Sequence, residues 1–129
     1  MASIRKEFVV ARHADAAWDA IRDVGALHTR LVPGFVLDCR LEGDARVVTF
    51  ANGVVTRELI VDVNEHDRRL VWAAVGGRLT HHNASVQVFS GEDGQTRIVW
   101  IADLLPNELA PAIETMIDHG IEAMKRTLV

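Results

Sequence analysis

Two polar side chains that can do chemistry lie inside otherwise apolar segments of this sequence. Glu58 stands in the middle of V-V-T-R-E-L-I-V, and His82 opens the alternating segment H-N-A-S-V-Q-V. A carboxylate and an imidazole both accept and donate protons at enzyme sites, and both orient polar ligands. Burying a carboxylate without a cationic partner also raises its pKa, which is common at functional sites. What each group does depends on the face of the strand that it occupies.

The residues by themselves leave that face open for both groups. Around Glu58, the alternate positions Val55, Arg57, Leu59 and Val61 form the more apolar phase, which favours a solvated Glu58. His82 suits a polar position inside an apolar pocket, but it equally suits the rim of one.

Metal, phosphate and nucleophile motifs are missing from the sequence. His81 and His82 are adjacent strand residues that point to opposite faces, so they cannot bind one ion together. The remaining histidines are scattered, Cys39 is the single cysteine, and neither a glycine-rich phosphate loop nor a nucleophile elbow occurs. We therefore expect no metal and no cofactor.

The elements that must position these groups are a strand, two short helices, six strands and a long helix. A Phe- and Val-rich run over 4–12 indicates the first strand, and short helices are predicted over 15–24 and 27–32. Turn residues divide 36–105 into six short strands in series, which is typical of an antiparallel meander. After Pro106 an apolar stripe recurs at spacings of three and four residues, and it consists of Ile113, Met116, Ile117, Gly120, Ile121, Met124 and Leu128.

A sheet with one apolar face must be covered, and the long terminal helix is the largest cover available. We therefore predict an α+β fold in which a seven-stranded antiparallel sheet wraps around the helix. With 129 residues, the chain is expected to form a single domain over 1–129.

A hairpin predicts which side chains share the inner face. Glu92-Asp93-Gly94 fits a three-residue loop with Gly94 in the left-handed position. A two-residue turn would shift the parity, but the three-residue loop separates polar from apolar side chains more cleanly. The predicted pairs are Val88 with Ile98, Val86 with Trp100, Ala84 with Ala102, and His82 with Leu104.

Small residues from two layers meet in this arrangement. Ala84 and Ala102 lie side by side beneath Trp100, and Gly120 lies opposite them on the helix. Because protein interiors are close-packed, small residues from two layers at one place suggest a void. The aromatic residues and Met116 would also suit an ordinary core. The predicted lining is Trp72, Ala84, Trp100, Ala102, Met116 and Gly120.

Composition excludes several classes of partner. The net charge is -4 and no long basic run occurs, which argues against binding to nucleic acid. No apolar run approaches the ~18 residues of a membrane span. The start M-A-S-I-R-K-E-F has no apolar targeting stretch. We expect a cytoplasmic protein without membrane insertion.

Several motifs on consecutive predicted strands resemble those of a known superfamily. They are R-E-L-I at 57–60, V-G-G-R-L at 75–79, and then His82, Ala84 and Val86. In this order they resemble the START/polyketide cyclase-like superfamily with the helix-grip fold, which includes the birch-pollen-type allergens. The local similarity is to plant abscisic-acid receptors and bacterial cyclase-like proteins.

The resemblance implies a hydrophobic ligand cavity, and it turns Glu58 inward together with Thr56 and Ile60. Two departures argue against the plant hormone as ligand. Leu37 stands near the place of the receptors' pocket lysine, and the gate loop is reduced to Asn52-Gly53.

The leading hypothesis is a binding protein for a small hydrophobic ligand that is cyclic, polyketide-like or lipid-like, with Glu58 and His82 as its polar anchors. The alternative is a polyketide cyclase or dehydratase in which Glu58 or His82 moves a proton. A third class is an interaction protein whose interior is solid core. Fold alone does not decide among them.

An inward Glu58 leaves apolar residues on the outer, convex sheet face, and two-fold dimers commonly cover such patches. The sequence therefore also predicts a homodimer through that face, which would carry Val55, Leu59, Val61, Val63, Val71, Ala73, Val75, Phe89, Val99 and Ile101.

Overall fold

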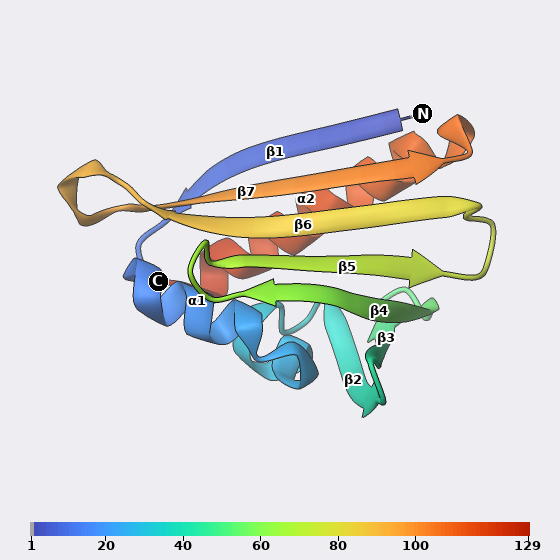
Figure 1. The fold of residues 1–129 in the computed structure, drawn as a ribbon, viewed down its shortest axis with the longest axis horizontal. Coiled ribbons are helices and arrows are strands. Elements are labelled where there is room, and N and C mark those ends of the chain that lie inside the picture. Colours follow the sequence, from blue (N-terminus) through green and yellow to red (C-terminus); the bar gives the residue numbers. More distant parts are fainter. Residues whose placement is uncertain (1) are drawn as a thin grey trace.

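The computed structural model describes residues 2–129 and contains one seven-stranded antiparallel sheet with the strand order β1-β7-β6-β5-β4-β3-β2 (Figure 1). This confirms the predicted α+β architecture. The strands are β1 (Ala2–Val10), β2 (Val36–Glu42), β3 (Ala45–Phe50), β4 (Val55–Asn64), β5 (Arg69–Val75), β6 (His81–Ser90) and β7 (Thr96–Leu105). The helical elements are α1 (Ala14–Arg22), the short turns η1 (Val24–Ala26), η2 (Leu27–Leu31), η3 (Glu92–Gly94) and η4 (Asn107–Leu109), and α2 (Ala110–Thr127).

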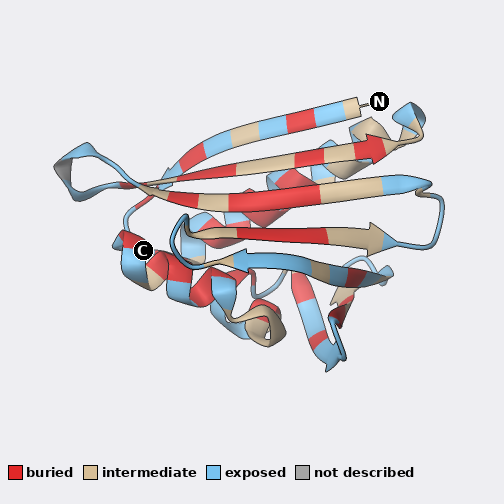
Figure 2. Cartoon of the chain, in the orientation of Figure 1, coloured by how far each residue is buried: buried red, intermediate tan, exposed pale blue. Residues whose placement is uncertain are grey.

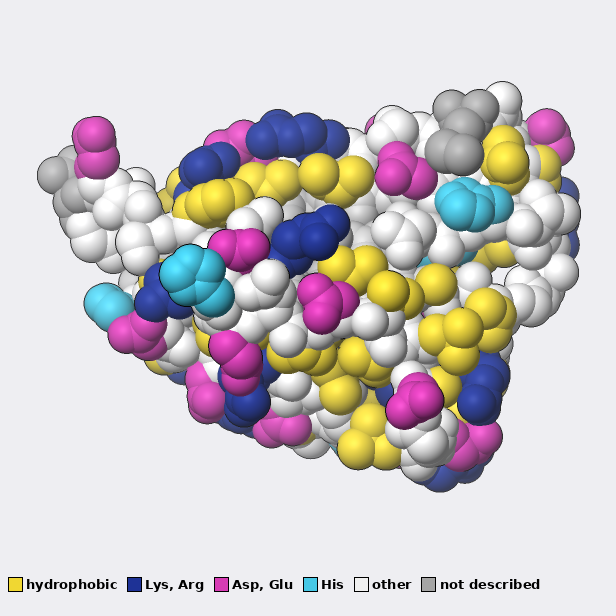
Figure 3. Space-filling model, viewed as in Figure 1, with side chains coloured by type: hydrophobic (Ala, Val, Ile, Leu, Met, Phe, Trp, Pro, Cys, Tyr) yellow, Lys and Arg dark blue, Asp and Glu magenta, His cyan; other side chains and the backbone are white. Residues whose placement is uncertain are grey.

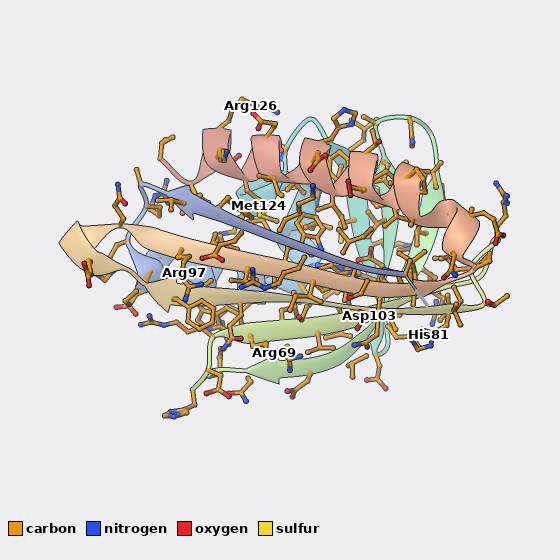
Figure 4. The ribbon with its side chains drawn as sticks, turned by 90° about the horizontal axis from the view of Figure 1, so that it is seen from above. Arg69, His81, Arg97, Asp103, Met124 and Arg126 are labelled. Atoms are coloured by element: carbon orange, nitrogen blue, oxygen red, sulfur yellow. The ribbon has the colours of Figure 1, made fainter. Side chains whose placement is uncertain are left out.

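The long helix α2 lies across one face of the sheet, as the views in Figures 1 and 4 both show. Pro111 is tolerated because it falls in the first turn, where a backbone N–H has no helical partner. In Figure 4 Met124 points from α2 toward the sheet and Arg126 points away. The helix packs most closely on β1 and η2. Over the middle of the sheet, the space beneath α2 is therefore left to side chains.

The hairpin between β6 and β7 has the predicted geometry. Gly94 has a φ of 76°, the left-handed conformation that the three-residue loop requires. The four predicted pairs, from His82 with Leu104 to Val88 with Ile98, are all present. The inner face of these strands is therefore mostly apolar, with His82 at one end and Ser90 and Thr96 at the other, and buried stretches run along β5, β6 and β7 in Figure 2.

The face of β4 is the one that the resemblance implied. Glu58 is 7% exposed, whereas Val55 is 61% and Val61 is 57% exposed on the opposite side. A bulge between Ile60 and Asp62 then shifts the register, so that Val63 pairs with the inward Leu70. The expectation that Val63 shares the outer face is therefore wrong, because the bulge changes the alternation.

The convex face carries a smaller apolar patch than the sequence suggests. Figure 3 shows apolar side chains gathered over β4 and β5. Val71 and Val99, both expected there, are already buried within the monomer, at 5% and 6% exposure. Phe89 is covered by the guanidinium of Arg97, which lies 4.4 Å from the centre of its ring. Of the residues predicted for this face, Val55, Leu59, Val61 and Val75 are the large apolar ones that remain exposed.

Candidate functional site

A pocket of about 290 Å³ lies between the inner face of the sheet and α2. Its wall is mostly apolar, and its polar members are few. The exposed part of the lining comes from the turn before β4 and the loop between β5 and β6, and half-buried residues of η4 and the start of α2 lie beside them, so the pocket opens there. In Figure 1 these three segments lie together at the right-hand end of the molecule.

Most of the residues predicted for the lining lie in this wall. They are Glu58, Trp72, His82, Ala84, Trp100, Ala102 and Met116. Gly120 is an exception with a clear physical reason. A Cβ added there would lie 2.9 Å from Cη2 and Cζ3 of Trp100. The expected void at Gly120 is therefore occupied by the Trp100 ring, which packs directly on the helix backbone.

Glu58 has a cationic partner that the sequence analysis did not identify. Arg46 on β3 donates from Nε to Oε1 of Glu58 over 2.8 Å, and both side chains are almost fully buried. The guanidinium also donates from Nη1 to the Val24 carbonyl over 3.3 Å and lies 5.7 Å from the Trp72 ring centre. These contacts compensate a charge that is costly to bury alone. The pocket wall therefore contains a preformed ion pair.

The ion pair belongs to a row that crosses the sheet. Arg46 on β3 pairs with Glu58 on β4, and Glu58 pairs with Ala74 on β5. The backbone N–H of Ala74 then donates to Nδ1 of His82 on β6 over 2.9 Å. All four residues line the pocket. Strand pairing thus places a charged pair and an imidazole on the same wall, separated by the small side chain of Ala74.

The His82 side chain supplies a hydrogen bond that the backbone of β6 does not supply to β5. The pairing of β5 with β6 runs from Arg69–Gln87 to Trp72–Ala84 and stops there. Beyond that point the Ala74 N–H has no strand partner, and the imidazole supplies its acceptor. The two strands therefore diverge toward the mouth of the pocket, and the His82 side chain bridges the divergence.

The environment of His82 favours its neutral form. Burial lowers the pKa of His82 below its ordinary value of 6.5, and neighbouring His81 lowers it further, whereas Asp103 acts in the opposite direction. His81 and Asp103 lie on the outer side of the sheet, where Figure 4 labels both. Because Nδ1 accepts a hydrogen bond, the proton of the neutral ring is on Nε2.

Two aromatic pairs shape the apolar part of the wall. Trp72 and Trp100 meet edge to face with ring centres 6.0 Å apart, and Phe35 and Phe50 do so at 5.3 Å. Sequence reasoning found the tryptophans but missed the phenylalanines. Phe35 follows the turn Pro33-Gly34 and Phe50 ends a strand, so neither lies in a periodic pattern. Their pairing depends on the adjacency of β2 and β3.

Arg46 was also missed, because a two-residue turn at Asn52-Gly53 would pair Glu58 with Val47 and put Arg46 on the opposite face. The observed loop is one residue longer, since the Phe50 N–H donates to the Val54 carbonyl, and this register pairs Arg46 with Glu58. The described residues contain no cluster of three or more His, Cys, Asp or Glu side chains placed to hold a metal ion. Across residues 2–129, no helix is long and apolar enough to cross a membrane.

Comparison with known proteins adds a family and a set of similar structures. The family described as "Polyketide cyclase / dehydrase and lipid transport" matches residues 1–129. Among curated proteins no relative matches this chain significantly.

Solved structures share the fold. A protein from Thermobifida fusca has 27% identity and a TM-score of 0.77, with 97% of this chain and 88% of that one covered. Norcoclaurine synthase from Thalictrum flavum, solved with dopamine and hydroxybenzaldehyde, has 17% identity and a TM-score of 0.73, with 97% and 84% covered. The di-domain ARO/CYC protein BexL has 13% identity and a TM-score of 0.83, with 98% of this chain and 46% of BexL covered.

The last two similarities show the fold alone, because their sequence identity is low. The family match, in contrast, spans the whole chain. The protein therefore belongs to the polyketide cyclase / dehydrase and lipid transport family.

Proposed function

We propose that the protein binds a small, largely apolar ligand of the cyclic, polyketide-like or lipid-like kind in this pocket. The observation that carries the proposal is a buried ion pair and a neutral imidazole in the wall of a mostly apolar cavity. Apolar burial supplies affinity at ~25 cal/mol per Å², less the cost of ordering, and Glu58 and His82 orient the polar groups of the ligand. The remaining lining residues provide the apolar contacts.

A pocket-filling variant with a matched control tests this proposal. Ala74 lines the pocket, and its neighbour Ala73 lies on the other face of the same strand. We expect Ala74→Leu to remove a small molecule that co-purifies with the protein, as seen by native mass spectrometry. Ala73→Leu should retain it. Equal retention by both variants, or no bound mass in the wild type together with no binding of apolar ring compounds, contradicts the proposal.

The second candidate is a cyclase or dehydratase. It is favoured by the placement of two titratable groups, Glu58 and His82, on either side of Ala74 in one wall. In this case one group removes a proton beside a substrate carbonyl, and the tryptophan pair holds a flat substrate. The test is incubation with a linear poly-β-ketone surrogate. Cyclisation to an isomer that separates from the surrogate by chromatography, or loss of water from it, supports an enzyme when His82→Phe abolishes it. Recovery of the unchanged linear surrogate supports binding alone.

We further propose that the protein forms a homodimer through its convex sheet face and resides in the cytoplasm. The dimer proposal rests on the exposed patch of Val55, Leu59, Val61 and Val75. The proposal for the cytoplasm rests on the sequence expectation and on Cys39, a buried free thiol of the kind that persists in reducing compartments.

A further inference from the structure

The hydrogen-bonding character of His82 toward the pocket follows from its partner in the sheet. A backbone N–H requires an acceptor, so the ring nitrogen facing Ala74 must be unprotonated. The neutral ring then carries its proton on Nε2, at the tip of the side chain, away from the sheet backbone. Within the described part of the chain, Nε2 has no hydrogen-bond partner. His82 therefore presents a donor to the pocket.

Glu58 presents the opposite character. Its Oε1 accepts from Arg46, whereas Oε2 receives no hydrogen bond from the residues that the structure describes. Glu58 lines the pocket, so the free lone pairs of Oε2 are available to a ligand donor. A donor and an acceptor thus lie on one wall, with the small side chain of Ala74 between them.

The spacing of the two groups is set by the sheet. Glu58 and His82 stand on strands two apart. Paired strands lie about 4.8 Å from one another, and β5 and β6 have already diverged here, so the two backbones are separated by more than roughly 10 Å. Both side chains project toward the cavity. A ligand that meets both must therefore carry its polar atoms at opposite ends of a rigid body.

Charge and size restrict the ligand further. Arg46 and Glu58 neutralise one another, and Arg78, also in the lining, is exposed at the mouth, where solvent screens it. A buried ligand charge would therefore remain uncompensated. The volume of about 290 Å³ lies just below the roughly 300–1,000 Å³ of most ligand pockets, which suits a ligand of one or two rings.

From these observations we infer that the pocket selects an uncharged, flat compound of one or two rings with a carbonyl-type acceptor at one end and a hydroxyl donor at the other. The carbonyl receives the Nε2–H of His82, and the hydroxyl donates to Oε2 of Glu58. This inference rests on the proposed function and specifies its ligand class.

Five single-ring probes test the inference. Para-hydroxyacetophenone carries both groups, acetophenone and para-ethylphenol carry one each, ethylbenzene carries neither, and para-hydroxybenzoate carries a charge. Dissociation constants are measured by NMR titration of the tryptophan indole signals. We expect para-hydroxyacetophenone to bind most tightly, with each missing group weakening affinity about three- to tenfold, the usual effect of one hydrogen bond.

Substitutions of His82 test whether its ring nitrogens cause the preference for a ligand with a carbonyl group. His82→Phe should remove the advantage of para-hydroxyacetophenone over para-ethylphenol. His82→Gln should retain that advantage, because an amide both accepts from the Ala74 N–H and donates into the pocket. Affinity for ethylbenzene should stay within about twofold in both variants, since it depends on apolar contact alone.

The outcomes separate this inference from the proposed function. If ethylbenzene binds and the other uncharged probes bind equally well, the pocket takes apolar ligands and the inference is overturned. Tightest binding of para-hydroxybenzoate overturns it as well, because an uncharged ligand is required. If none of the five probes binds, the inference is overturned, and the proposed function fails with it when the wild type also carries no co-purified small molecule.

Discussion

At the scale of single residues, the buried pair of Arg46 and Glu58 determines how the site responds to substitution. Two charges that compensate one another inside the protein cannot be removed singly without leaving an uncompensated charge. The chain contains a natural comparison in Arg57 and Glu42, whose ion pair of 2.7 Å lies at the surface with side chains 44% and 48% exposed. The two pairs have similar contacts and very different burial.

Removing one partner should therefore be costly only in the buried pair. We expect Arg46→Met to lower the free energy of unfolding by about 3–5 kcal/mol, and Arg57→Met by about 0–1 kcal/mol. The double variant Arg46→Met with Glu58→Gln should recover part of the loss, because no buried charge remains unpaired. Urea unfolding measures all three. Equal losses of unfolding free energy for Arg46→Met and Arg57→Met would show that burial does not make the Arg46–Glu58 pair more costly to break.

The lowered pKa of His82 predicts a pH dependence with a definite sign. The unfolded chain binds a proton near pH 6.5, whereas the folded protein, in which burial and His81 lower the pKa of His82 and Asp103 opposes them, binds it at lower pH. The contribution of the neutral His82 ring to the free energy of unfolding is therefore fully present above pH 6.5. It is lost as the pH falls toward the pKa of His82 in the folded protein. His82→Gln should reduce this slope in urea unfolding. Thr80→Ser, at an exposed position near His82 that carries no titratable group, serves as control and should leave the slope unchanged.

At the scale of elements, the contact of α2 with β7 depends on Gly120. Glycine is normally about 1 kcal/mol worse than alanine inside a helix, so Gly120→Ala would ordinarily stabilise. Here the added Cβ would meet Trp100 at 2.9 Å. We expect a net loss of about 1–3 kcal/mol, typical of overpacking. In a Trp100→Phe background the same Gly120→Ala substitution should cost less stability, because the smaller ring leaves room for the added Cβ. Thermal unfolding of the wild type, the two single variants and the double variant would show this. Stabilisation by Gly120→Ala alone would contradict this packing.

Short-range patterns predicted much of this arrangement. The β6–β7 register followed from one loop of three residues, because alternation then sorts every side chain of two strands. The inward face of Glu58 required the resemblance, since the apolar phase around it favours the opposite face. The bulge near Val61 and the end of the β5–β6 pairing at Trp72 were not predicted, because both depend on how neighbouring strands fit within the complete sheet and leave no mark in the alternation of either strand.

The candidate site was less predictable than the fold for a related reason. Pocket residues on β6 and β7 share a hairpin and could be placed, whereas Arg46, Phe35 and Phe50 come from elements whose relative positions follow from the complete sheet. At Gly120 the sequence correctly indicated that a small residue faces the sheet, but the space it leaves is not part of the pocket. A neighbouring large side chain fills the space, and sequence alone does not show which one does so.

At the scale of the whole molecule, the convex face predicts an assembly. Val55, Leu59, Val61 and Val75 are 38–61% exposed around the outer surface of β4 and β5. We expect sedimentation velocity at micromolar concentration to show a dimer, and Leu59→Glu to convert it to a monomer. Leu37→Glu, at an exposed leucine of β2 outside this patch, should leave the dimer intact. A wild-type monomer, or equal effects of both substitutions, would place the association elsewhere or remove it.

Because of the hydrogen bond from Ala74 to His82, hydrogen exchange at one backbone amide reports on the state of the pocket wall. In most of the sheet, exchange of an amide hydrogen with solvent deuterium requires strands to separate. The Ala74 amide is held by a side chain at the point where the β5–β6 pairing has ended, so rotation of one imidazole is enough to release it. Its exchange rate should therefore follow the opening of the pocket wall, slowing when a ligand engages His82 while the amides of β1 and β7 remain unaffected.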